Sequence, residues 1–291
     1  MREWMELLVQ APDALAEEAS ARLIESGAAA VERRESQPGA SLLITHFMLE
    51  NGVTQKLRAA EAALAGLGIG PDAIAVRNIE EVDWVGRSRE MFTARAYGER
   101  LWVRPPWGKS PAPAGREEII LEPSLAFGTG RHASTHLCLE TIERMCGERP
   151  PRRFVDIGCG SGILSAAAIK LGAEGALALD LDPAAADTAR KLADENGLAG
   201  RMRVREGTLE PEALGDWWGQ ADMLAANIFL TPLRELAPRM AEALAKGGRG
   251  VLSGIGYEQA DTLAGIAEAA GLAVTGRKYR EEWAAVEIEK P

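Results

Sequence analysis

The segment Phe154 to Gly162, FVDIGCGSG, holds residue types that let a backbone wrap closely around a small ligand. It stands between an apolar run and a helical pattern, so its glycines indicate a strand-to-helix junction. Glycines at such a junction allow close approach of the backbone, and the helix that follows offers N–H groups without intrahelical partners. Gly158 and Gly160 are therefore candidate ligand-binding residues.

An acidic residue follows this loop at a spacing that fits nucleoside binding. Asp180 ends the next apolar strand, ALALDLD, 22 positions after Gly158. A carboxylate at that place can accept hydrogen bonds from both ribose hydroxyls of an adenosine. The alternative is a tight turn beside a surface acid, but the pairing of loop and acid favours binding. Asp182 is a weaker ribose candidate, because it precedes Pro183 and can cap the next helix.

Asn227 is a second candidate for chemistry, in the stretch ADMLAANIFLTPLREL at 221–236. It follows an apolar strand at the carboxyl edge, where open α/β sheets bind ligands. It could instead simply end the strand. Its position, taken with Gly158 and Asp180, favours a functional role.

The stretch LAFGTGRHASTHLCLE, at 125–140, has two glycines around a threonine just before a helical pattern. It lacks the Gly-Lys-Ser/Thr ending of a phosphate-binding P-loop. We expect its glycines to allow a tightly folded loop and a helix to start at Ser134 or Thr135. Arg131 has no assigned role.

The elements that position these residues alternate between short apolar strands and helices from about residue 118 onward. Strands are expected at RRFVDIGC, GALALDLD, MRVRE, ADMLAANI, GRGVLSGI and LAVTGRKY, and a long helix at 233–245. Such alternation predicts a mostly parallel sheet with helices on both faces. We assign residues 118–291 to this domain.

The N-terminal part has a different pattern. Residues 1–79 show strands and helices in the order βαββαβ, which is typical of a small ferredoxin-like α+β domain. Residues 80–97 are expected to form a connecting helix, and the prolines around 105–117 predict a surface loop, so 80–117 is a helix and linker.

Composition excludes several classes of protein. The net charge of −10 argues against direct nucleic-acid binding but is compatible with a small molecule or a basic protein as substrate. Three cysteines and three histidines are too few and too scattered for a metal site, so no metal is expected. The N-terminus is not a signal peptide, and no apolar run approaches the roughly 20 residues of a membrane span. We expect a cytoplasmic protein without a membrane partner.

Two resemblances follow from these motifs. The spacing Gly-x-Gly-x-Gly with Asp156 two residues before Gly158 resembles class I S-adenosylmethionine-dependent methyltransferases. The chain further resembles the bacterial ribosomal-protein-L-eleven methyltransferases, the PrmA family. The matching segments are GERLWVRPPW, LEPSLAFGTGRHASTHLCLE, VDIGCGSGIL, ALDLDP, ANIFLTPLREL and the late EEW at 281–283.

The resemblance implies a Rossmann-like methyltransferase domain that binds S-adenosyl-L-methionine through Thr135, Gly158, Gly160, Asp180 and Asn227. It further implies that the N-terminal domain recognises the substrate, a ribosomal protein of the large subunit, whose lysine or N-terminal amines are methylated. We expect Asn227 to orient the amine during catalysis. The family usually has GTHPTT where this chain has GRHAST at 130–135, and two prolines are missing from the Asn-Pro-Pro-aromatic tetrad that many N-methyltransferases have at 227–230.

Other interpretations stay open on the sequence. Another protein lysine or a small-molecule amine could be the acceptor, or the chain could be a binding module that keeps the cofactor pocket without transferring methyl groups. Phe229 could stabilise a cationic amine or belong to the core. Cys159 lacks the local signature of a nucleophile and is expected to be a small loop residue.

Overall fold

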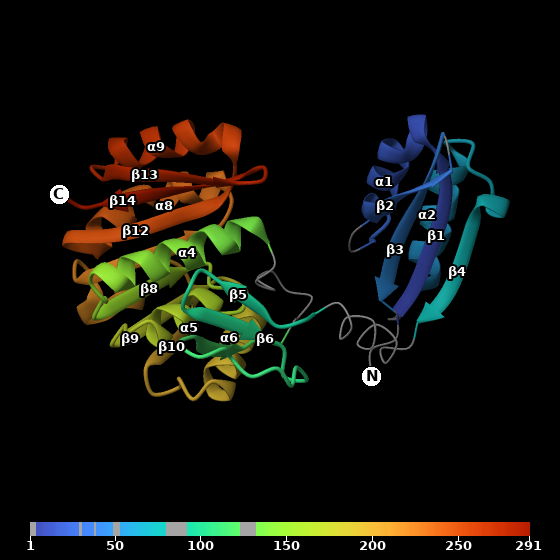
Figure 1. Cartoon of the computed structure of the whole chain (residues 1–291). Helices are drawn as coiled ribbons and strands as arrows, with labels where there is room; N and C mark the ends of the chain where they lie inside the picture. The colour runs from blue at the N-terminus through green and yellow to red at the C-terminus, as the bar shows by residue number, and fades with distance from the viewer. Residues whose placement is uncertain (1–3, 29–30, 38, 49–52, 80–91, 123–131) are drawn as a thin grey trace. The chain divides into compact units, whose positions relative to one another are not determined.

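The computed structural model describes residues 4–28, 31–37, 39–48, 53–79, 92–122 and 132–291 (Figure 1). The chain divides into two compact units, Met1–Met91 and Phe92–Pro291. Residues 92–117, which the sequence analysis gives to a connecting segment, thus belong to the second compact unit.

The N-terminal unit is the expected ferredoxin-like arrangement. Its four strands pair antiparallel in the order β2-β3-β1-β4. Apolar side chains of strands and helices meet in one core that includes Leu7, Leu23, Phe47 and Leu64. The elements are β1 (Trp4–Pro12), α1 (Ala16–Glu25), β2 (Val31–Gln37), β3 (Ala40–Met48), α2 (Val53–Ala65) and β4 (Ile74–Ile79).

The second unit opens with a small sheet of its own. Strands β5 (Arg95–Tyr97), β6 (Leu101–Arg104) and β7 (Glu117–Ile120) pair in the order β5-β6-β7. The expectation of a helix through residue 97 is therefore wrong for 95–97, while its residues 80–91 lie outside the described part. The segment 95–97 pairs antiparallel with β6, and Tyr97 is buried in the main core of this unit.

The main sheet has seven strands in the order β10-β9-β8-β11-β12-β14-β13. All neighbours are parallel except β14, which runs antiparallel to both β12 and β13. This confirms the mostly parallel sheet. Its strands are β8 (Arg153–Ile157), β9 (Gly175–Asp180), β10 (Met202–Glu206), β11 (Ala221–Asn227), β12 (Leu244–Gly256), β13 (Ala273–Arg280) and β14 (Trp283–Glu289).

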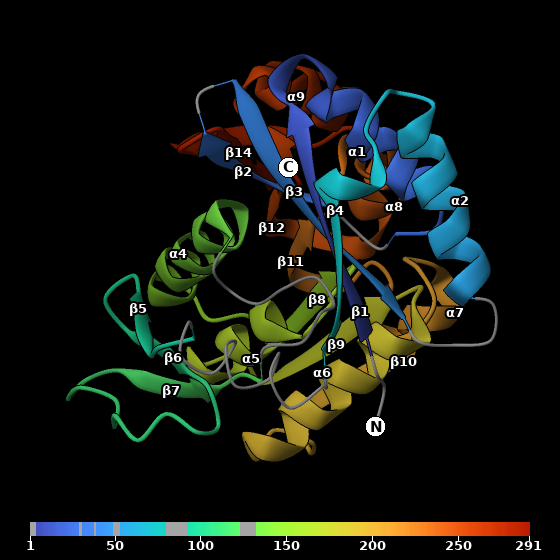
Figure 2. The same ribbon diagram turned by 90° about the vertical axis from the view of Figure 1, so that its right-hand side faces the viewer.

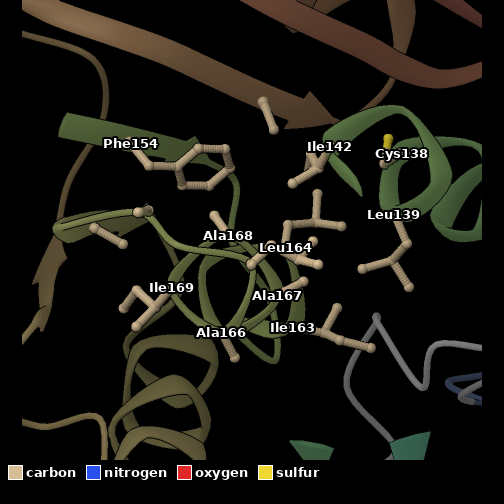
Figure 3. Close-up of a cluster of buried hydrophobic side chains, with 14 of the residues drawn as sticks. Cys138, Leu139, Ile142, Phe154, Ile163, Leu164, Ala166, Ala167, Ala168 and Ile169 are labelled. Carbon is tan, nitrogen blue, oxygen red and sulfur yellow. The ribbon is translucent and has the colours of Figure 1, made fainter. Parts of the chain in front are cut away.

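Helices cover both faces of this sheet, each with its own apolar core. One core joins the sheet to α4, α5 and α6, and Figure 3 shows Ile142 and Leu139 of α4 facing the side chains of α5. The other core joins it to α7, α8 and α9. In the turned view of Figure 2, α4 and α8 lie on opposite sides of β11 and β12. The helices are α4 (Ala133–Glu148), α5 (Ile163–Lys170), α6 (Pro183–Glu195), α7 (Pro211–Leu214), α8 (Leu230–Ala243) and α9 (Ala260–Ala269).

Further elements of the second unit differ from the sequence expectations. The long helix begins at Leu230, three residues earlier than predicted. Helix α9 and strand β14 were not predicted, although β14 is the strand that the motif EEW leads into. Within the described part of the chain, no helix has the length and apolar character to cross a membrane.

Candidate functional site

The glycine loop after β8 has a backbone that only glycine adopts easily. Gly158, Gly160 and Gly162 have φ angles of 67°, 53° and 80°. This left-handed region is strained for residues with a side chain. A Cβ on Gly158 would also overlap Cγ2 of Ile228, which follows β11. The loop therefore turns at the carboxyl edge of the sheet, with Ile228 packed closely against Gly158.

Asp180, at the end of β9, is hydrogen-bonded to this loop. Its Oδ2 accepts a hydrogen bond from Gly160 N at 2.8 Å, and its Oδ1 accepts one from Asp182 N at 3.0 Å. A carboxylate oxygen has a second lone pair, so both oxygens can still accept a ribose hydroxyl. The structure thus brings Gly158, Gly160 and Asp180 together at one edge. Asp182 caps α6 through a bond of 2.9 Å from Ala184 N, which confirms the capping interpretation.

Asp156 lies beneath the loop, fully buried in β8. Its Oδ2 accepts hydrogen bonds from Ser165 N at 3.0 Å and Ser165 Oγ at 2.8 Å, in the first turn of α5. Its Oδ1 accepts none from a described residue. Burial raises the pKa of Asp156 to about 7, and the charge of Asp180 adds to the shift, against the bonds from Ser165. This carboxyl group fixes the start of α5 through its two hydrogen bonds from Ser165.

Asn227 and Thr135 meet although 92 positions separate them in sequence. Asn227 ends β11, and Thr135 is buried in the first turn of α4. Asn227 Nδ2 donates to Thr135 Oγ1 at 3.3 Å, while Asn227 Oδ1 is buried and accepts no hydrogen bond from a described residue. Buried acceptors are rarely left unpaired, so this oxygen is suited to a donor supplied by a ligand.

Helix α4 starts earlier than expected. Its first residue is Ala133 and His132 is the N-cap, so the prediction of Ser134 or Thr135 as the start is wrong by one or two residues. His132 packs its ring edge-on against Trp283, with centroids 4.2 Å apart. The sequence analysis missed this contact, and its signal was the motif EEW. Arg131 and the AFGTG stretch lie outside the described residues.

The structure also bears on Cys159, on Phe229 and on a possible metal site. Burial raises the pKa of the Cys159 thiol far above its usual value, so the thiol stays protonated and is a poor nucleophile. Phe229 is 64% exposed, which excludes the core interpretation. Among the described residues, no three His, Cys, Asp or Glu side chains gather in a way that could hold a metal ion.

The fold and the site define a class I S-adenosylmethionine-dependent methyltransferase. The sheet is open and mostly parallel, a glycine loop follows one central strand, and an acid ends the next. The residues fit the cofactor, because Gly158 and Gly160 hold the loop backbone in a left-handed turn without side chains, Asp180 can accept hydrogen bonds from ribose hydroxyls, and Asn227 Oδ1 accepts no hydrogen bond from a described residue.

The chain belongs to the ribosomal protein L11 methyltransferase (PrmA) family, whose sequence profile matches residues 3–291. It is 34% identical over 295 residues to the ribosomal protein L11 methyltransferase of Escherichia coli (strain SMS-3-5 / SECEC), covering 96% of this chain and 97% of that protein. Identity to the same-named protein of Pelotomaculum thermopropionicum is 38% over 234 residues, covering 80% of this chain and 74% of the relative.

A solved structure shows the same likeness. The ribosomal protein L11 methylase of Lactobacillus delbrueckii subsp. bulgaricus superposes with a TM-score of 0.61 at 30% sequence identity. The match covers 68% of this chain and 99% of that chain.

Proposed function

We propose that this enzyme transfers methyl groups from S-adenosyl-L-methionine to lysine amines, the N-terminal amine, or both, of ribosomal protein L11. The observation that carries the proposal is Asn227 Oδ1, which is buried, accepts no hydrogen bond from a described residue and is held beside Thr135 at the edge where the glycine loop lies. Family membership supports L11 as the acceptor.

On the cofactor side, the left-handed backbone at Gly158 and Gly160 would line the ligand, and Asp180 would accept hydrogen bonds from its ribose hydroxyls. Thr135 of α4 and Asn227 of β11, which are hydrogen-bonded to each other, would lie at its methionine end. The bound cofactor supplies an electrophilic methyl group on a sulfonium. Because this centre carries no phosphate, the site needs no P-loop lysine.

On the acceptor side, Asn227 Oδ1 accepts a hydrogen bond from the incoming amine. This bond orients the lone pair of the amine nitrogen in line with the bond between the sulfur and the methyl group. A lysine amine has a reference pKa of about 10.4 and must first lose a proton. Desolvation beside the half-buried amide favours the neutral form, and water takes the proton. Alignment therefore does most of the catalytic work.

The wider setting follows the same proposal. The N-terminal unit recognises the ribosomal protein, and the enzyme works in the cytoplasm without binding nucleic acid. The net charge of −10 supports a basic protein as the partner over RNA.

The test is methylation of purified L11, read by intact-mass and peptide mass spectrometry. The wild-type enzyme is expected to add methyl groups to amines of L11. Asn227→Ala should lower the rate at saturating cofactor by roughly 10- to 100-fold, because the amine loses its alignment.

Gln220→Ala is the matched control, since it removes an exposed amide just before the same strand. Cofactor affinity is measured by calorimetry for all three proteins. Absence of added methyl groups on L11 with the wild-type enzyme would refute the proposed acceptor. An unchanged rate in Asn227→Ala would refute the role of Asn227.

A further inference from the structure

We propose that an exposed acidic and aromatic surface next to Asn227 binds the basic segment that carries the acceptor lysine. This surface, the acceptor rim, consists of Phe229, Tyr257, Glu258, Glu281 and Glu282. The inference rests on the proposed function and adds the residues that select the substrate.

The rim is formed by neighbouring turns at the carboxyl edge of the main sheet. Ile228, just before Phe229, donates its N–H to Ser253 O of β12 at 3.1 Å. Tyr257 follows β12 and donates its N–H to Glu282 O at 2.9 Å. Hydrogen bonds therefore connect the turns after β11 and β12 to the turn between β13 and β14.

The rim adjoins the proposed amine site through Trp283. Trp283 pairs with Gly256 across β14 and β12, and its ring contacts His132. His132 caps the helix whose first turn holds Thr135, the partner of Asn227. A chain lying on the rim can thus place a lysine side chain toward Asn227.

The charge of the rim is negative. Glu258, Glu281 and Glu282 are exposed, and none forms an ion pair with a described residue. Two nearby cations have other partners, because Arg280 forms a salt bridge with Glu140 at 2.8 Å and Lys278 lies 3.6 Å from Glu287. Three free carboxylates complement a lysine-rich segment.

The aromatic members suit the same occupant. Phe229 is 64% exposed and Tyr257 60%, although large aromatic side chains usually lose much of their surface to packing. Aromatic faces attract ammonium groups and pack against the aliphatic stems of lysines. The combination of acids and exposed rings therefore favours a basic peptide over an apolar or acidic one.

The turn that carries two of the acids is held in a strained form. Among the described residues, Glu281 is the one non-glycine residue with a positive φ, at 54°. It occupies the two-residue turn between Arg280 and Trp283, which are paired in register. This conformation costs energy for a residue with a side chain, yet glycine is not used there. A carboxylate is present where the backbone alone would favour glycine.

The experiment compares the double variant Glu281→Gln/Glu282→Gln with Glu242→Gln/Glu268→Gln. The control changes two exposed acids near the ends of α8 and α9, the helices that lead away from this edge. Steady-state methylation of L11 gives kcat and KM at several salt concentrations. Calorimetry gives cofactor affinity, and sedimentation gives the oligomeric state.

The rim variant is expected to raise the KM for L11 by roughly 3- to 10-fold, since each exposed ion pair is worth up to about one kcal/mol. Its kcat and cofactor affinity should match the control, and the salt dependence of its KM should weaken. A wild-type enzyme that leaves L11 unmodified would refute the proposed function. An active wild type with an unchanged KM in the rim variant would refute the rim alone. A change in self-association without a change in KM would assign the surface to a second copy and also overturn the inference.

Discussion

Asp156 and Asp180 end or nearly end adjacent strands, yet the fold uses them differently. Both Asp180 oxygens accept main-chain N–H groups at the site, and Asp180 is only partly buried. Asp156 is fully buried and bonds Ser165 at the start of α5. The sequence pattern placed Asp156 near the loop, but its burial and its partner depend on α5 packing over β8.

The raised pKa of Asp156 predicts a pH-dependent stability difference for Asp156→Asn. The folded-state pKa of about 7 exceeds the ordinary value of 3.8, so the native state holds a proton that the unfolded state releases. Wild-type stability is therefore lost as pH rises from 3.8 through about 7, by at most about 4 kcal/mol at about 1.4 kcal/mol per unit.

Asparagine does not titrate. As pH rises across this interval, the free energy of unfolding of Asp156→Asn should therefore increase relative to that of the wild type. Urea denaturation at pH values from about 5 to 8 measures the difference. A difference that stays constant with pH would contradict the pKa shift. Ser165→Ala is a useful control, because it removes one hydrogen bond but leaves the titrating group.

At the scale of elements, the conformation of the glycine loop depends on its own glycines and on the neighbouring residue Ile228. Its left-handed backbone follows from its glycines, which the sequence shows. The close approach of Ile228 follows from the pairing of β8 with β11, which no local pattern reveals. Similarly, the motif EEW indicated family likeness, while its strand β14 and its contact with α4 came from the structure.

Gly158→Ala should separate these two effects. Gly158 has a φ of 67° and its added methyl would overlap Ile228, whereas Gly197 has a φ of 66° and open space around it. Both variants carry the backbone strain, on the order of 1 kcal/mol, but only Gly158→Ala adds the steric overlap.

We expect thermal and urea unfolding to show a loss for Gly158→Ala that exceeds that of Gly197→Ala by about 1–3 kcal/mol. Cofactor affinity, measured by calorimetry, should fall only in Gly158→Ala. Equal losses of stability in the two variants would show that Ile228 moves aside.

At the scale of the whole molecule, each unit has a core of its own. The N-terminal core gathers Leu7, Leu23, Phe47 and Leu64, and the second unit has two cores on the faces of its sheet. The candidate residues Thr135, Gly158, Gly160, Asp180 and Asn227 all lie in the second unit. Cofactor binding and substrate recognition can therefore be tested apart.

Deletion of residues 1–91 is expected to leave cofactor affinity unchanged and to lower kcat/KM for L11 by roughly 100-fold or more. The reason is that a tethered recognition domain raises the effective concentration of its substrate. Calorimetry and L11 methylation measure the two quantities, and circular dichroism confirms that the fragment is folded. If the fragment methylated L11 at the full rate, the proposed role of the N-terminal unit in recognising L11 would be wrong.

The sequence by itself determined the alternation of strands and helices, the glycine loop and the acid at Asp180, because each depends on local spacing and backbone preference. It also predicted the βαββαβ unit in full. Only the tertiary structure decided that Thr135 meets Asn227, that His132 contacts Trp283 and that Ile228 closes on Gly158. These contacts join residues that are distant in sequence. The spatial order of the strands in the sheet brings them together.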